Sequence, residues 1–145
     1  MVDVWAVIGN QNAGKTSTIR ALTGVPGKRR TWDVAYSANG PSIPTYVHPQ
    51  ALQEGKIAPA AFIADVKKAK VSRVIVALRL KAARGQPDAQ GYLSQFLQAG
   101  WTVNSAVLNP AKPLQGILTK AVKLRGRPLP SNQIARQLRQ RWGIA

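Results

Sequence analysis

The stretch VDVWAVIGNQNAGKTSTIRALTG, residues 2–24, decides how the rest of the chain can fold. Residues 4–8 are a short run rich in β-branched side chains, which is typical of a buried parallel strand. Residues 9–16 match G-x-x-x-x-G-K-[ST] at every fixed position. Residues 16–23 carry Ile19 and Leu22 at helical spacing, and Gly24 and Pro26 end that segment. The stretch therefore predicts a strand, a glycine loop and a helix in succession.

The residue types of this loop suit the binding of phosphate groups. Gly9 and Gly14 let backbone N–H groups and a helix N-terminus approach phosphate oxygens closely. We expect the Lys15 ammonium to neutralise β- and γ-phosphate oxygens and the Thr16 hydroxyl to bind Mg²⁺. The alternative is a glycine-rich turn that binds nothing. The predicted nucleotide-binding residues are Gly9, Asn10, Gln11, Asn12, Ala13, Gly14, Lys15, Thr16, Ser17 and, from a later strand, Asn109.

With this Walker A pattern in its strand–loop–helix context, the chain resembles the P-loop NTPase superfamily. The specific resemblance is carried by residues 2–24, and beyond them the likeness is one of topology. It implies an α/β fold with a mostly parallel sheet flanked by helices, and the nucleotide at the carboxyl ends of the strands. It also implies ATP or GTP and Mg²⁺ as ligands, and hydrolysis of the nucleoside triphosphate as the reaction.

The charge of the chain points to a polyanionic partner. The 145 residues hold 21 Lys and Arg against five acids, which gives a formal net charge of +16. No Asp or Glu follows Asp88. Such a field favours nucleic acid first, and an anionic membrane surface or an acidic protein next. The alternative is a solvated surface that keeps the protein soluble.

The length and the residue types also bear on domain organisation and compartment. The chain fits one nucleotide-binding domain over residues 1–126, with residues 127–145 as a basic C-terminal helix packed on it or appended to it. It has no cysteine, no signal-peptide pattern at residues 1–8 and no apolar run of about 20 residues. We therefore expect no transmembrane segment and a cytoplasmic location.

The remaining chain predicts alternating strands and helices. A strand at 32–38, the turn pair Asn39 and Gly40, and a returning strand at 42–47 form a hairpin, in which Pro44 requires an edge or a bulge. Residues 48–55 are expected to form a loop. Further predicted elements are helices at 60–70, 92–97, 114–124 and 131–142, and strands at 71–80 and 101–108. The fold class is thus α/β, with basic C-terminal helices that carry Arg136, Arg139 and Arg141 as contacts for phosphates.

The hairpin after the first helix resembles the translation-factor-like GTPases more than the RecA-like ATPases. That resemblance implies a role for Thr31 near Mg²⁺ and the γ-phosphate, although a Thr that merely leads a strand is an equal alternative. In these GTPases a later strand ends in N-K-x-D, which selects guanine. Here Asn109 is followed by Pro110, Ala111 and Lys112, so guanine specificity is not supported. ATP and GTP both remain open.

A strand-ending carboxylate is missing from the predicted site. Residues 61–65 fit four apolar residues and an acid, but Pro59 and the short link to the next strand favour a helix, with Asp65 at its surface. Asp33 is then the expected acid near the nucleotide, ahead of Asp65. We assign catalysis to Lys15, Thr31 and Asp33, and the metal to Thr16 and Asp33. His48 could orient water or be an ordinary loop residue, and Arg29 or Arg30 could act as an arginine finger or be solvated.

The sequence thus predicts a small P-loop NTPase that binds ATP or GTP with Mg²⁺ and hydrolyses it slowly, coupled to nucleic acid or an acidic partner. One alternative is a nucleotide-dependent binding module without turnover. Another is a small-molecule kinase, for which no acceptor base is identified.

Overall fold

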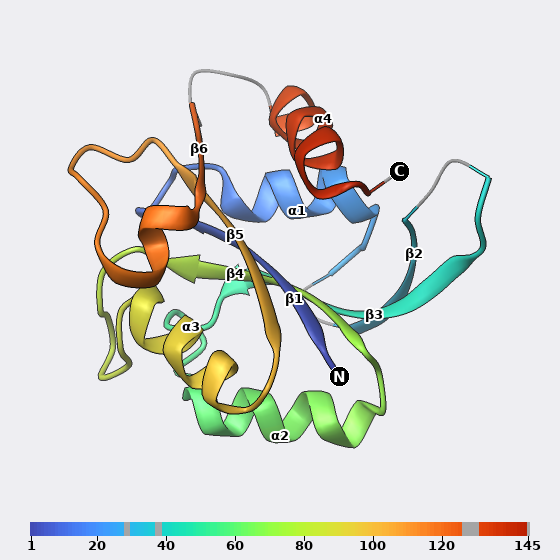
Figure 1. Cartoon of the computed structure of the whole chain (residues 1–145), viewed down its shortest axis with the longest axis horizontal. Helices are drawn as coiled ribbons and strands as arrows, with labels where there is room; N and C mark the ends of the chain where they lie inside the picture. Colours follow the sequence, from blue (N-terminus) through green and yellow to red (C-terminus); the bar gives the residue numbers. More distant parts are fainter. Residues whose placement is uncertain (28–29, 37–38, 126–130, 145) are drawn as a thin grey trace.

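The computed structural model describes residues 1–27, 30–36, 39–125 and 131–144 and shows an α/β fold built on one mixed sheet (Figure 1). The strand order is β2-β3-β4-β1-β5-β6, and only β2 runs antiparallel to its neighbour. The strands are β1 (Asp3–Gly9), β2 (Arg30–Ala35), β3 (Ser42–Ala51), β4 (Arg73–Arg79), β5 (Thr102–Leu108) and β6 (Val122–Leu124). The helices are α1 (Lys15–Thr23), α2 (Pro59–Ala69), α3 (Ala89–Gln98) and α4 (Ser131–Trp142), with a 3-10 turn η1 (Gly116–Lys120).

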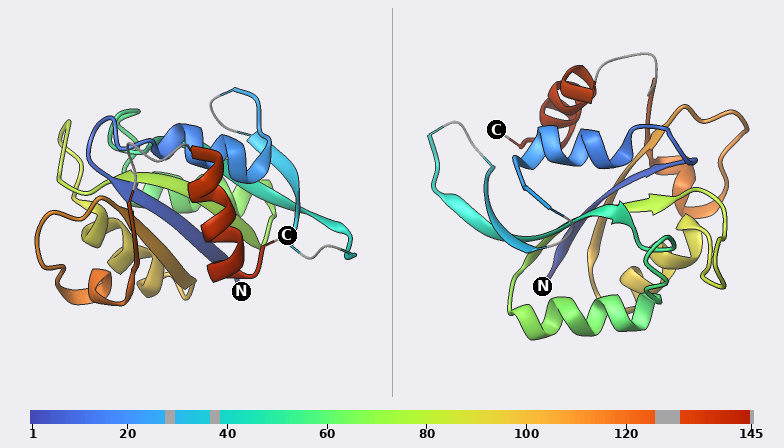
Figure 2. Two further views of the ribbon diagram at one scale, coloured as in Figure 1. Left: turned by 90° about the horizontal axis from the view of Figure 1, so that it is seen from above. Right: turned by 180° about the vertical axis from the view of Figure 1, so that it is seen from behind.

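The helices cover both faces of the sheet, α1 and α4 on one and α2 and α3 on the other (Figures 1 and 2). β1 alternates between the two layers: Val4, Ala6 and Ile8 pack toward α2 and α3, and Trp5 and Val7 pack toward α1 and α4. Central strands with two buried faces need apolar residues at nearly every position. This explains why residues 4–8 and 74–78 read as continuous apolar runs, and it confirms the predicted α/β sheet.

The prediction of a helix over residues 114–124 is wrong. These residues form η1 and the edge strand β6, which pairs with β5. Leu118 packs in the layer of α2 and α3, whereas Leu124 packs in the layer of α1 and α4. Because the segment passes from one face of the sheet to the other, one amphipathic helix could not bury both leucines. In the described part of the chain, the expected basic C-terminal helices therefore reduce to α4.

The predicted loop at residues 48–55 is also wrong at its start, because β3 continues to Ala51. The pairing of β3 with β4 shifts between His48 and Ala51, which is a β-bulge that includes Pro49. Proline cannot donate to a strand ladder, and a bulge is one of the few places in a sheet that tolerate it. Pro44 is accommodated differently, since the pairing of β3 with β4 begins only at Tyr46.

The C-terminal helix belongs to the core. Ile134, Ala135 and Leu138 of α4 are buried in the layer that also contains Ile19 and Leu22 of α1. The predicted domain boundary at 126/127 and the end of the strand predicted to reach residue 38 lie outside the described residues. Within the described ranges, no helix has the length and apolar character needed to cross a lipid bilayer.

Candidate functional site

The carboxyl ends of β1 and β4 lie next to each other at one edge of the sheet. These strands are neighbours, but β1 leads into α1 on one face and β4 leads into α3 on the other (Figure 1). Where successive connections leave adjacent strands toward opposite faces, open α/β sheets bind their ligands. The glycine loop, residues 9–16, lies at this point.

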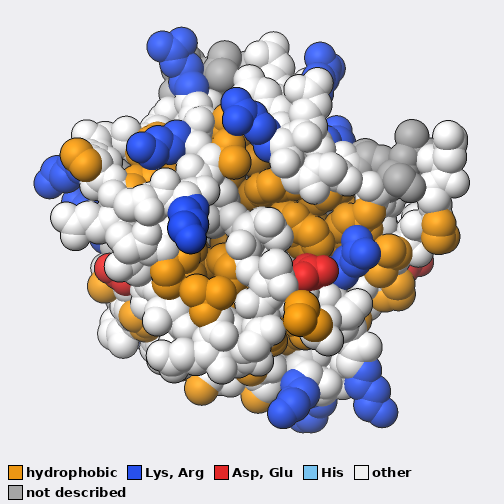
Figure 3. Space-filling model, in the orientation of Figure 1, with side chains coloured by type: hydrophobic (Ala, Val, Ile, Leu, Met, Phe, Trp, Pro, Cys, Tyr) orange, Lys and Arg blue, Asp and Glu red, His pale blue; other side chains and the backbone are white. Residues whose placement is uncertain are grey.

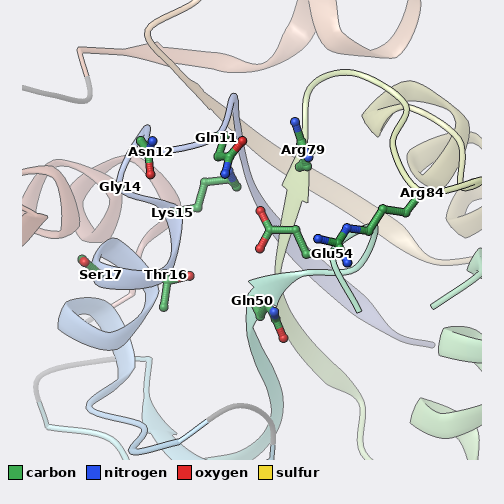
Figure 4. A pocket seen from close by; sticks show the side chains of 10 residues that line it. All are labelled: Gln11, Asn12, Gly14, Lys15, Thr16, Ser17, Gln50, Glu54, Arg79 and Arg84. Atoms are coloured by element: carbon green, nitrogen blue, oxygen red, sulfur yellow. The ribbon is translucent and has the colours of Figure 1, made fainter. Parts of the chain in front are cut away.

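A pocket of about 440 Å³ opens beside the glycine loop (Figure 4). Its walls come from the start of α1, the carboxyl end of β3 and the segment that follows β4. The lining residues are Gln11, Asn12, Gly14, Lys15, Thr16, Ser17, Gln50, Glu54, Arg79 and Arg84.

The backbone of the glycine loop requires its glycines. A Cβ on Gly9 would lie 2.8 Å from the Cβ of Ala13, so a side chain there would force the loop apart. Gly14, the N-cap of α1, has φ of 93°, a conformation that side chains rarely adopt. No side chain caps α1, so its first N–H groups face the pocket without a side-chain acceptor. This helix end is suited to receive an anion.

The Lys15 side chain is buried against the glycine loop. Its side chain is only 6% exposed, and its Nζ donates a hydrogen bond of 2.8 Å to the main-chain oxygen of Asn10. Burial lowers the pKa of Lys15, the nearby Glu54 carboxylate opposes that shift, and Arg79 adds to it. A phosphate group beside this ammonium would supply the negative charge that the buried cation lacks.

Thr16 is oriented by the bulge of β3. Its hydroxyl donates a hydrogen bond of 2.9 Å to the main-chain oxygen of Pro49. With its proton committed to Pro49, the hydroxyl oxygen keeps its lone pairs for a ligand in the pocket. The bulge thus turns a strand carbonyl toward the start of α1 and fixes a potential metal ligand.

Glu54 is the carboxylate of this pocket, and sequence reasoning missed it. It lies three residues beyond the end of β3 and faces the space shared with Lys15 and Thr16 (Figure 4). An acid in the turn after a buried strand is the pattern that could have revealed it. The prediction of a loop over residues 48–55 hides this pattern, because it ends the strand before Ala51.

Buried Gln53 fixes the position of Glu54. Its Nε2 donates to the main-chain oxygens of Arg79 at 3.0 Å and Pro87 at 3.2 Å, and its Oε1 accepts from the Arg79 N–H at 2.9 Å. The side chain therefore joins the turn after β3 to the end of β4, as a neighbouring strand would. Glu54 and Arg79 are thereby both held in the lining of one pocket.

Two arginines add positive charge opposite the glycine loop. Arg79 ends β4, and Arg84 lies in the following loop with φ of 52°, beside Gly85 with φ of 78°. Both line the pocket. The predicted arginine finger, Arg29 or Arg30, concerns side chains outside the described residues.

The structure does not bring the other predicted catalytic residues to the pocket. Thr31 lies opposite Tyr46 and Asp33 opposite Pro44, so each step along β2 leads away from the carboxyl end of β3. Both are exposed, and neither lines the pocket. The place expected for Asp33 is held by Glu54.

Three further positions are also accounted for. His48 is buried and packs edge-on against Phe62 of α2, on the face of the sheet away from α1. Asp65 lies in α2, as the sequence predicted. Asn109 follows β5, and its N–H donates to the main-chain oxygen of Leu124 at 2.8 Å. It does not line this pocket.

The donors in the pocket fit Mg²⁺ bound together with a nucleotide. Thr16 offers a hydroxyl oxygen and Glu54 a carboxylate, both hard ligands of the kind that Mg²⁺ prefers. Within the described part of the chain, no group of three or more His, Cys, Asp or Glu could hold a metal ion by itself. Phosphate oxygens would therefore complete the coordination shell, as is usual for Mg²⁺ sites.

No protein-family model, no curated protein and no solved structure matches this chain. The assignment of the pocket therefore rests on the chemistry of its own residues.

Proposed function

We propose that the protein is a small P-loop NTPase that binds ATP or GTP with Mg²⁺ and hydrolyses it slowly. One observation carries this proposal: Lys15, Thr16, Glu54 and Arg79 line one pocket at the uncapped start of α1. A cradle of N–H groups, a buried ammonium, a hydroxyl and a carboxylate are what phosphoryl transfer from a nucleotide requires.

Each side chain has a role that follows from its place. The N–H groups of α1 and the Lys15 ammonium bind the phosphate oxygens, and Arg79 and Arg84 stabilise the charge that develops on the transferred group. Glu54 accepts a hydrogen bond from the attacking water and orients it. Mg²⁺, when bound, neutralises charge on the β- and γ-phosphates.

We expect slow turnover because few carboxylates line the pocket. Among the described residues that line the pocket, Glu54 is the one carboxylate, and it would have to serve both the hydration shell of the metal and the attacking water. Turnover of the isolated protein is expected near that of an unassisted GTPase, on the order of 10⁻⁴ to 10⁻² per second. A partner such as nucleic acid or an acidic protein would raise this rate by supplying a further group.

Replacement of the buried lysine tests the proposal. Lys15→Ala should abolish measurable binding of ATP and GTP in calorimetric titrations with Mg²⁺, because the cradle loses its main cation. The fold should persist, since burial of this charge is itself unfavourable. Lys68→Ala, which removes an exposed lysine of α2, is the matched control. Affinity of Lys15→Ala equal to that of the wild type would refute the assignment of the pocket.

Single-turnover measurements separate the proposal from the alternative of a binding module. With protein in excess over labelled nucleotide, the proposal requires slow but complete conversion to the diphosphate. Binding without any conversion, with and without DNA or RNA, would favour the binding module.

A further inference from the structure

A second cavity, of about 300 Å³, is lined in part by Asn10 of the glycine loop. We name it the side pocket; its walls are Asn10, the residues just after β4, the start of α3, the loop after β5 and η1. Asn10 links the two sites, because its main-chain oxygen accepts the hydrogen bond from Lys15 of the first pocket and the residue itself lines the side pocket. A ligand whose phosphates lie on the glycine loop would therefore meet the side pocket at Asn10.

The chemistry of the side pocket differs from that of the phosphate site. Leu80 and Leu114, both half-buried, and the buried Leu118 give it apolar surface. Asn10, Gln90 and Gln115 add three amides, each of which can donate and accept hydrogen bonds. Apolar faces with a few amides at the edge suit a flat heteroaromatic ring whose rim carries donors and acceptors.

The amide of Gln90 packs closely against the backbone at Gly116. A Cβ on Gly116 would lie 2.4 Å from Nε2 of Gln90, and Gly116 has φ of 60°. The start of α3 is tied to β4 by the N–H of Ala89, which donates to the main-chain oxygen of Leu80 at 3.3 Å. The side pocket is therefore formed by packed elements and not by a surface loop alone.

We propose that the side pocket binds the purine nucleoside of the triphosphate, with Gln90 and Gln115 contacting the edge of the base. This inference rests on the proposed function, since it assumes that the phosphates lie at Lys15. A purine is favoured over a pyrimidine because its larger ring covers more of the leucine surface. Lys81 and Lys112, exposed residues at the same cavity, remain accessible to the ribose or to a phosphate.

Inorganic tripolyphosphate separates the two sites, because it carries the phosphates of the nucleotide without the nucleoside. Its affinity, and those of ATP, GTP, CTP and UTP, are measured with Mg²⁺ by calorimetry on the full chain. Wild-type protein should bind at least one purine nucleotide roughly tenfold or more tightly than tripolyphosphate, as a well-placed buried hydrogen bond to the base would give. Pyrimidine nucleotides should fall between the two.

Variants of Gln90 and Gln115 test whether the side pocket causes the difference in affinity between the purine nucleotide and tripolyphosphate. Gln90→Leu and Gln115→Leu should each lower the affinity for the purine nucleotide toward that for tripolyphosphate, and leave tripolyphosphate binding unchanged. Retained tripolyphosphate binding also reports that the variant is folded. Gln98→Leu, an exposed glutamine at the other end of α3, is the matched control and should change neither affinity.

The outcomes distinguish this inference from the proposed function. Equal affinities for tripolyphosphate and all four nucleotides would overturn the side pocket as a nucleoside site and leave the phosphate site intact. If Gln90→Leu and Gln115→Leu both keep the wild-type preference for purine nucleotides, the side pocket is likewise overturned as the nucleoside site. If neither tripolyphosphate nor any nucleotide binds, the proposed function fails and this inference fails with it.

Discussion

At the scale of single residues, the glycine loop and the Glu54 carboxylate that faces it reach the same pocket by different means. Gly9, Gly14, Lys15 and Thr16 are adjacent in the chain, so their spacing alone defines the cradle. Glu54 reaches the same pocket through the register of β3 with β4 and the hydrogen bonds of Gln53. The strand register and these hydrogen bonds belong to the tertiary structure, which the spacing of residues in the sequence does not reveal.

Glu54 and Asp33 are expected to affect hydrolysis differently, because only Glu54 lines the pocket. Glu54→Gln should slow single-turnover hydrolysis by roughly 10² to 10⁴, the usual contribution of a positioned base, while affinity for the nucleotide in the absence of Mg²⁺ changes little. Asp33→Asn, far from the pocket along β2, should alter neither quantity. Both are measured with labelled nucleotide and protein in excess. A rate for Glu54→Gln equal to the wild type, or an equal loss in the two variants, would show that Glu54 does not act in hydrolysis.

At the scale of elements, the predictions are confirmed where one sequence pattern corresponds to one strand or one helix. Continuous apolar runs identified β1 and β4, and Pro59 identified the start of α2. They were wrong where a segment changed its environment part-way. Residues 114–124 pass from one face of the sheet to the other, and residues 48–51 bulge without ending their strand. Sequence periodicity assumes one environment per segment, so it missed both.

The docking of α4 on α1 yields a stability prediction. Leu138 is fully buried between these helices, and Arg139 donates hydrogen bonds to the main-chain oxygens of Ala21 at 2.7 Å and Leu22 at 3.2 Å. Leu138→Ala should lower the free energy of unfolding by about 2–5 kcal/mol, through lost burial and a cavity. Gln140→Ala, at an exposed position of α4, should change it by less than about 0.5 kcal/mol.

Urea denaturation monitored by circular dichroism measures both values. If α4 were only appended to the domain, Leu138→Ala would leave the main unfolding transition where the wild type has it.

At the scale of the whole molecule, the chain carries a net charge of +16. On the face drawn in Figure 3, Lys and Arg side chains are scattered over separate places and do not form one patch, while Asp and Glu are few. The expected phosphate contact through Arg136, Arg139 and Arg141 must be revised, because Arg139 is engaged with α1. Arg136 and Arg141 are exposed on α4. They are the residues of that helix available to an outside polyanion.

Nucleic-acid binding by this surface should depend steeply on salt, because each neutralised phosphate releases counterions. The double variant Arg136→Gln and Arg141→Gln should reduce the slope of log affinity against log salt concentration by roughly 1.4 for single strands and about 1.8 for duplex DNA, if both residues contact phosphates. Lys67→Gln and Lys68→Gln remove the same charge from α2, on the opposite face of the sheet, and should change the slope less.

Fluorescence anisotropy over a salt series measures both slopes. Equal reductions in the two double variants would mean that the attraction is a property of net charge and not of α4. Absence of binding even at low salt would exclude nucleic acid as the partner and turn attention to an acidic protein.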